Sequence, residues 1–255
     1  MIQKIILASL ILVSAVYPIN SQTKSEIWIT EDVRLLHLQD SVFMHTTWEE
    51  IENYGRVGSN GMLVIRDGQA VMVDTPMGEP KTRLIAEYLK DSLGVTIKKH
   101  IAGHYHADCV GGLDYLKAKG VVSIANYMTI NKCKEIGMPV PTDSFVDSLN
   151  FDFNGLKIQC RYFGGGHSFD NITVYLPEKK ILFGGCLIKS LAAKNIGANG
   201  ESVLDEWEVT VKRIIEKYQG PLTIIPGHGD YGSEELLAHT VRLAEQQENN
   251  DNSSR

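Results

Sequence analysis

The amino-acid sequence predicts an α/β protein in which two sheets pack face to face between outer helices, a four-layer αββα sandwich. Two observations lead to this prediction. A unit of strand hairpin, helix and strand occurs twice along the chain, and both copies end their strands on polar residues suited to binding a metal. Packing sheet on sheet with helices outside buries the apolar faces of both units. We therefore expect the functional site at the strand ends, between the two sheets.

The first unit precedes a group of histidines. Residues 61–75 predict two strands joined by a turn at Asp67 and Gly68, a dipeptide typical of tight turns. Residues 80–93 carry apolar side chains at helical spacing and predict an amphipathic helix. Residues 95–102 then predict a strand that leads directly into His104.

The second unit has the same order. Residues 171–183 predict a second hairpin, and it leads into Cys186. Residues 203–218 again show the helical spacing of apolar residues. Residues 222–225 predict a short strand that ends next to His228.

Length and composition favour a single globular domain. The chain has 255 residues, of which 43% are hydrophobic and 22% charged, enough to bury a sizeable core. We expect residues 22–245 to form one domain of two quasi-repeated halves, and the polar residues 246–255 to form a disordered tail. The formal net charge of -6 and the absence of a Lys/Arg block argue against a nucleic-acid partner.

The first 21 residues predict an export signal. Lys4 precedes a mostly apolar run over residues 5–16, which is too short to span a bilayer and suits a signal peptide. We expect cleavage near Ser21, a periplasmic mature protein and no membrane span. Since no exposed apolar repeat or heptad is visible, we expect a monomer.

The densest group of potential metal ligands is His104, His106 and Asp108. Alternate residues of an extended segment point the same way, so the two imidazoles share one face. Two imidazoles and a carboxylate at a strand end are suited to zinc. A helix over residues 110–119 is expected to follow, after the tight turn that Gly111 and Gly112 allow.

Three further segments each place a potential ligand beside glycine, after a predicted strand. Their ligands are His167, Cys186 and His228. Glycine lets the backbone approach closely while the side chain turns inward. Chance is a poor explanation for four such segments together. The other histidines lack glycine neighbours and are expected to serve packing or the surface: His37, His45, His100 and His239. Cys133 and Cys160 are expected to be free, partly buried thiols.

These ordered motifs resemble the metallo-β-lactamases. His-x-His-x-Asp, Gly-x-Gly-His, Gly-Gly-Cys-x-x-Lys and Pro-Gly-His are similar to the broad-spectrum, two-zinc subclass, subclass 1 of class B. The resemblance spans about residues 28–243 and includes the motifs at 59–61 and 74–76. Cys186 separates the chain from the glyoxalase-type thioesterases. Those enzymes resemble a different pattern, with a bridging carboxylate and with a histidine at the position where this chain has Cys109.

The resemblance implies two zinc ions and assigns their ligands. The first zinc would be held by His104, His106 and His167. The second would be held by Asp108, Cys186 and His228. Asp74 is expected to accept a hydrogen bond from one of the ligating imidazoles, whose outer N–H needs a partner.

The resemblance also implies residues that contact substrate. Lys189 would anchor the substrate carboxylate, as a positioned point charge. Residues 50–58 would form a mobile flap, in which Tyr54 offers an apolar face. Similar enzymes often carry Asn after the glycine that corresponds to Gly197; here Ala198 stands there and Asn199 comes next, so Asn199 is the expected amide near the lactam oxygen.

The implied activity is hydrolysis of the amide bond of β-lactam antibiotics by a metal-bound hydroxide, which gives antibiotic resistance. Asp108 would act in catalysis by accepting a hydrogen bond from that hydroxide, with no covalent acyl-enzyme. Two alternatives stay open. One is another hydrolase of the same fold, acting on lactones, thioesters or phosphoesters, because a fold does not determine a substrate. The other is an inactive zinc-binding relative.

Overall fold

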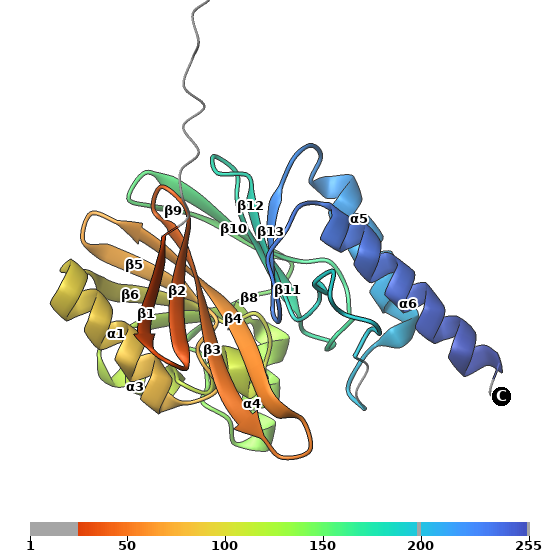
Figure 1. Ribbon diagram of the computed structural model, residues 1–255, viewed down its shortest axis with the longest axis horizontal. Helices are drawn as coiled ribbons and strands as arrows, with labels where there is room; N and C mark the ends of the chain where they lie inside the picture. Colours follow the sequence, from red (N-terminus) through yellow and green to blue (C-terminus); the bar gives the residue numbers. More distant parts are fainter. Residues whose placement is uncertain (1–24, 198–199, 254–255) are drawn as a thin grey trace, which may run out of the picture.

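Two sheets pack face to face with helices on their outer sides in the computed structural model, which describes residues 25–197 and 200–253 (Figure 1). The predicted four-layer αββα architecture is confirmed. The larger sheet has eight strands in the order β1-β2-β3-β4-β5-β6-β7-β8, and the smaller has five in the order β13-β12-β11-β10-β9. The export signal expected at residues 1–21 lies outside the described residues.

The larger sheet is antiparallel from β1 to β5 and parallel from β5 to β8, because each later connection contains a helix. Its strands are β1 (Glu26–Thr30), β2 (Val33–Gln39), β3 (Val42–Ile51), β4 (Gly55–Arg66), β5 (Gln69–Val73), β6 (Thr96–Ile101), β7 (Val122–Asn126) and β8 (Asp143–Phe145). Its helices are α1 (Glu79–Leu93), α2 (Ala107–Val110), α3 (Leu113–Ala118) and α4 (Tyr127–Ile136).

The smaller sheet is antiparallel except for the pair β12 and β13, which α5 connects. Its strands are β9 (Ser148–Phe153), β10 (Leu156–Tyr162), β11 (Ile172–Leu176), β12 (Ile181–Gly185) and β13 (Thr223–Pro226). Helices α5 (Leu204–Lys217) and α6 (Glu235–Ser253) cover its outer face (Figure 1).

Both predicted repeat units are present, as β4-β5-α1-β6 and β11-β12-α5-β13. The turn between β4 and β5 has positive φ at Asp67 (50°) and Gly68 (70°), the left-handed conformations that a tight hairpin turn requires. The helix expected over residues 110–119 is instead divided into α2 and α3. Gly112 lies between them, and a Cβ there would be 1.9 Å from Oγ1 of Thr82 in α1. The interruption therefore accompanies a close approach of this segment to α1.

The expected disordered tail is wrong for residues 246–253, which form the last turns of α6. Leu243 and Ala244 are buried in the cluster between α5, α6 and the smaller sheet, and they anchor the helix just before this segment. Gln246, Gln247 and Glu248, which follow, are good helix formers, so the helix continues through these polar residues.

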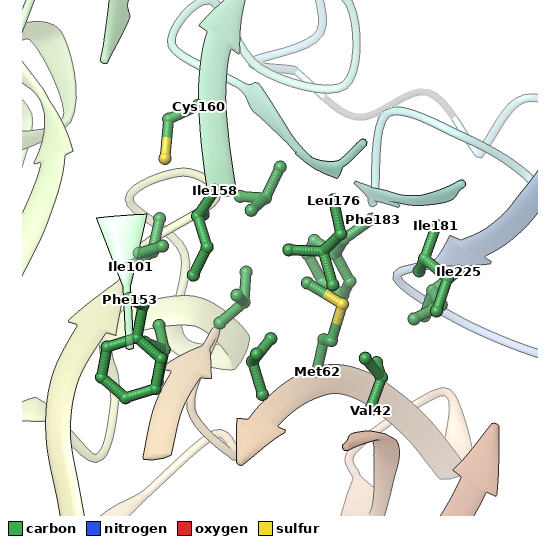
Figure 2. Packing of buried hydrophobic residues seen from close by; sticks show 14 of the residues in the cluster. Val42, Met62, Ile101, Phe153, Ile158, Cys160, Leu176, Ile181, Phe183 and Ile225 are labelled. Carbon is green, nitrogen blue, oxygen red and sulfur yellow. The ribbon is translucent and has the colours of Figure 1, made fainter. Parts of the chain in front are cut away.

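The main core lies between the two sheets. Val42 and Met62 of the larger sheet point toward Leu176 and Phe183 of the smaller sheet (Figure 2), and all four side chains are buried. Burial of each such side chain contributes about 1.5–3 kcal/mol to folding. Three further apolar clusters lie outside the sheets: one packs α5 and α6 on the smaller sheet, and two pack α1, α3 and α4 on the larger sheet. Among the described residues, no helix combines the length and apolar composition that a membrane crossing needs.

Candidate metal centre

The potential ligands gather where strands of both sheets end. His104, His106 and Asp108 follow β6, and His167 lies in the loop after β10. Cys186 directly follows β12, and His228 follows β13. The side chains of His104 and Cys186 are buried, so the strand ends place the cluster partly inside the molecule.

One trio consists of Asp108, Cys186 and His228. Oδ2 of Asp108 lies 3.3 Å from Sγ of Cys186 and 3.5 Å from Nε2 of His228. Sγ of Cys186 lies 3.4 Å from the same His228 nitrogen. A carboxylate oxygen, a sulfur and an imidazole nitrogen therefore lie close enough together to hold one metal ion.

The other trio consists of three imidazoles. Ring centroids are 4.5 Å apart for His104 and His106, 4.9 Å for His104 and His167, and 5.0 Å for His106 and His167. Nδ1 of His106 and Nε2 of His167 lie only 3.1 Å apart. Nε2 of His104 is buried and has no hydrogen-bond partner among the described residues.

The two trios adjoin each other. Nε2 of His104 lies 3.9 Å from Oδ1 of Asp108, whose other oxygen faces Cys186. The ligand atoms of His104, His167 and Cys186 also lie within 4.8 Å of one another. Burial raises the pKa of Asp108, but the charges of His104 and His228 outweigh it and hold the pKa below its ordinary value. Asp108 therefore stands ionised between the trios.

This donor set fits zinc. Zinc prefers imidazole nitrogen, thiolate sulfur and carboxylate oxygen, and all three converge here from four separate segments. A buried nitrogen without a hydrogen-bond partner, as in His104, is costly unless another group binds it. A bound cation would give the His104 nitrogen the partner that it lacks.

Three outer contacts orient the imidazoles. Nδ1 of His104 lies 3.0 Å from Sγ of Cys109, and Nδ1 of His228 lies 2.8 Å from the carbonyl oxygen of Gly58. Nε2 of His106 lies 2.9 Å from Oε2 of Glu201. Contacts of this kind hold a ligating imidazole in one orientation and one tautomer.

Glu201 and Gly58 were not anticipated from the sequence. Glu201 follows Gly200 but does not come after a predicted strand, and it lies 95 residues from its partner His106. No local pattern marks such a residue, because its role arises only where two distant loops meet. The residue order of the chain contains no signal for either contact.

Asp74 differs from the expectation. It accepts a hydrogen bond from the backbone N–H of Gly103 at 2.5 Å, and it is the Cys109 thiol that lies between the Asp74 carboxyl and His104. A Cβ on residue 103 would lie 2.8 Å from Oδ2 of Asp74, so a larger residue there would require the Asp74 carboxyl to shift. Burial raises the pKa of Asp74 to about 8.

His45 and His100 bind backbone carbonyls next to the potential ligands. Nε2 of His45 donates to the carbonyl of Asp74 at 3.1 Å, and Nε2 of His100 donates to the carbonyl of Cys109 at 3.0 Å. Both rings are buried, and burial lowers the pKa of each to about 4. Their expected packing role therefore includes fixing two backbone segments next to the ligands.

Cys133 and Cys160 are free and buried, in agreement with the expectation of free thiols. Burial raises the pKa of Cys133 to about 11 and the pKa of Cys160 to about 12. Both thiols are therefore protonated, and unreactive, at neutral pH.

The expected substrate-contacting residues have different surroundings. Nζ of Lys189 lies 5.1 Å from the ring centroid of Trp207, and burial lowers its pKa. Tyr54 lies in the turn between β3 and β4 and is 80% exposed. Asn199 and its neighbour Ala198 lie outside the described residues.

The fold and the two ligand trios define a metal-binding αββα protein, and comparison with known proteins specifies the family. The family model of the metallo-beta-lactamase superfamily matches residues 54–228. The chain is 41% identical over 236 residues to metallo-beta-lactamase type 2 of Bacteroides fragilis, covering 92% of this chain and 95% of that protein. It is 30% identical over 214 residues to metallo-beta-lactamase type 2 of Bacillus cereus, covering 84% of this chain and 83% of that protein.

Solved structures agree. A metallo-beta-lactamase from Pontibacter korlensis superposes with a TM-score of 0.80 at 31% identity, covering 84% of this chain and 99% of that one. The metallo-beta-lactamase FIM-1 from Pseudomonas aeruginosa, in its mono-zinc form, superposes with a TM-score of 0.78 at 30% identity, covering 86% of this chain and 98% of that one. The chain therefore belongs to the metallo-β-lactamase superfamily, and the resemblance that the motifs indicated is confirmed.

Proposed function

We propose that this protein is a zinc-dependent hydrolase that opens the ring amide of β-lactam antibiotics and so gives resistance to them. The observation that carries the proposal is the pair of adjoining trios, one of three imidazoles and one of Asp108, Cys186 and His228. Relatives that align over most of the chain are named metallo-beta-lactamase, which supports the substrate class.

The proposal includes two zinc ions. Nε2 of His104, Nδ1 of His106 and Nε2 of His167 would hold the first, because these nitrogens face one another. The second would be held by Asp108, Cys186 and His228. Zinc supplies Lewis acidity and lowers the pKa of bound water to about 7.

The protein groups would orient the attack. Oδ1 of Asp108 faces the imidazole trio while its Oδ2 faces Cys186, so this carboxylate accepts a hydrogen bond from the attacking water and directs it. Asp108 is in this sense the catalytic residue. Because it is ionised, the carboxylate acts as an acceptor without first losing a proton.

Three other residues would bind the substrate. Lys189 anchors the carboxylate that adjoins the lactam, and its ammonium is held in place over the Trp207 ring. Tyr54, exposed in the turn of the β3–β4 hairpin, offers an apolar face to the antibiotic. Asn199 supplies an amide to the lactam oxygen.

We also propose that residues 1–21 direct export to the periplasm and that the mature protein is a monomer. The basic residue, short apolar run and polar boundary at the N-terminus support export. Cell fractionation with mass spectrometry of the mature N-terminus tests the first proposal, and light scattering of the purified protein tests the second. A cytoplasmic, uncleaved or dimeric protein would contradict them.

Hydrolysis of a penicillin, a cephalosporin and a carbapenem by the zinc-loaded protein tests the activity. We expect lactam absorbance to fall, the loss to stop with a chelator, and activity to return on adding zinc. A folded protein with bound zinc that turns over none of the three would overturn the proposal. Lactone, thioester and phosphoester substrates in the same assay would then separate another hydrolase from an inactive zinc-binding relative.

A further inference from the structure

We propose that Trp48 is a positioning residue for His228, and that through it the β3–β4 hairpin controls metal affinity at the trio of Asp108, Cys186 and His228. The inference rests on the proposed metal binding by that trio. It concerns a residue outside the ligand set, in the half of the β3–β4 hairpin nearer the exposed turn that contains Tyr54.

The contact runs through Gly58. Trp48 on β3 is paired directly with Gly58 on β4. A Cβ on residue 58 would lie 2.9 Å from Nε1 of Trp48 and 3.1 Å from its Cδ1, so the indole lies against the glycine backbone. The carbonyl oxygen of that same glycine lies 2.8 Å from Nδ1 of His228. The indole therefore packs on the peptide segment that orients the imidazole.

The indole is itself held firmly. It stacks on Trp28 of β1 with a centroid separation of 5.4 Å and an interplanar angle of 13°. The guanidinium of Arg34 lies 5.6 Å from the Trp28 ring and 5.5 Å from the Trp48 ring, and that of Arg56 lies 5.0 Å from Trp48. Aromatic stacking and cation–π contacts of this kind both hold the indole in place.

The backbone of Trp48 is also tied to two neighbouring elements. Its N–H donates to the carbonyl of Asp32 at 3.1 Å, and its carbonyl accepts from Nζ of Lys81 in α1. Lys81 also pairs with Glu49 at 2.8 Å. The part of the hairpin around Trp48 is therefore held by the β1–β2 turn and by α1, whereas the turn itself is exposed.

The loop that carries His228 has a separate anchor. The side-chain amide of Asn60 donates to the carbonyls of Pro226 and Gly229 at 3.0 and 2.7 Å, and its backbone N–H donates to the carbonyl of Gly227 at 2.8 Å. Removing the Trp48 indole leaves these bonds in place. The expected effect is a change in the orientation of the His228 ring, without displacement of its loop.

The imidazole trio provides an internal reference. His104 and His106 take their outer contacts from Cys109 and Glu201 rather than from Gly58. A change at Trp48 should therefore act selectively on the cysteine-containing trio. General loss of folding would affect both trios.

Titration with Co²⁺, which replaces zinc and gives a thiolate-to-metal absorption band when Cys186 binds it, tests the inference. We expect Trp48→Ala to weaken the Co²⁺ binding reported by this band about tenfold, the range seen when an outer contact of a ligand is lost. Binding reported by the ligand-field bands of the imidazole trio should stay unchanged. Trp48→Phe, which keeps an aromatic face on Gly58, should bind nearly as the wild type does.

Tyr115→Ala is the matched control. Arg83 of α1 and Lys119, just after α3, each place a cation near the Tyr115 ring, so loss of this ring removes similar contacts outside the β3–β4 hairpin. Gly58→Ala is the second variant, because its methyl group would displace the indole; it should show the same selective loss as Trp48→Ala. Thermal unfolding of every variant shows that binding is measured on folded protein.

The outcomes separate the inference from the proposed function. A wild-type protein without the thiolate band would overturn the metal proposal, and with it the positioning role. A wild-type band that keeps its affinity in Gly58→Ala and in Trp48→Ala would overturn the positioning role alone. Equal weakening at both trios would also overturn it, since the effect would then be general.

Discussion

Nδ1 of His104 lies 3.0 Å from the sulfur of Cys109, so a thiol holds the side of this imidazole that faces away from the ligand cluster. The same thiol contacts the Asp74 carboxyl, and both side chains are buried. The first predicted ligand is therefore supported by a cysteine, with a carboxyl behind it.

The first prediction concerns this contact. Cys109→Ala should weaken zinc binding by the imidazole trio about tenfold or more, because a buried imidazole N–H loses its partner. Cys109→Ser, which keeps a group able to accept that bond, should retain most of the affinity. Competition against a chromophoric chelator measures both. Equal affinities for the alanine and serine variants would contradict a role for this hydrogen bond.

The second prediction concerns Glu201. Its carboxylate contacts His106 at 2.9 Å, but its side chain is 52% exposed, so water screens the interaction. Glu201→Gln should therefore reduce zinc affinity less than Cys109→Ala does, by a few-fold. The same chelator competition, repeated at high salt, checks this. A loss larger than that of the buried contact would show that exposure does not weaken this interaction.

Lys189 provides the third prediction. Lys189→Met keeps the apolar stem against Trp207 and removes only the charge. We expect KM for a β-lactam to rise about tenfold or more, since one charge-assisted hydrogen bond to the substrate is lost, with a smaller change in kcat. Steady-state kinetics measure both. Lys194→Ala, at an exposed lysine nearby, is the control; an unchanged KM in Lys189→Met would rule out the anchor.

The fourth prediction is a pH dependence of stability. Burial lowers the pKa of His45 and of His100 from 6.5 to about 4. Below pH 6.5 the unfolded chain takes up protons that the folded protein does not bind. With respect to these two histidines, the free energy of unfolding should therefore be highest above pH 6.5. It should fall between pH 6.5 and 4, by up to about 1.4 kcal/mol per pH unit for each histidine.

Urea unfolding of the chelator-treated protein at several pH values measures this slope. The double variant His45→Gln with His100→Gln keeps a donor for each carbonyl but does not titrate, so its stability should vary less across that pH range. Asp74 titrates in both proteins and cancels in the comparison. His37→Gln, at a histidine outside the core, serves as the control. Parallel pH profiles for the wild type and the double variant would contradict the prediction.

The fifth prediction concerns the inter-sheet core. Met62 is fully buried between the sheets, so Met62→Ala should lower the free energy of unfolding by about 2–5 kcal/mol. Leu84→Ala, at a side chain that is 37% exposed, should cost much less. Denaturant unfolding compares the two. Similar losses would mean that the interior near Met62 adjusts to fill the space.

Local sequence patterns predicted most of the fold. Apolar periodicity located both repeat units, and the left-handed turn at Asp67 and Gly68 follows from residue types that tolerate it. The pattern was wrong where packing outweighed it. Polar composition indicated disorder at residues 246–253, but burial of the preceding turns of α6 carries the helix through them.

Within the candidate site, the sequence by itself determined which residue types stand at the strand ends, because glycine-flanked histidine and cysteine are local signals. The tertiary structure decided what holds them. His228 meets Gly58 across 170 positions of the chain, and His106 meets Glu201 across 95. The sequence of a short segment indicates the backbone conformation and the burial pattern of that segment alone. Contacts between distant loops exist only after two sheets have packed and set the distance between their ends.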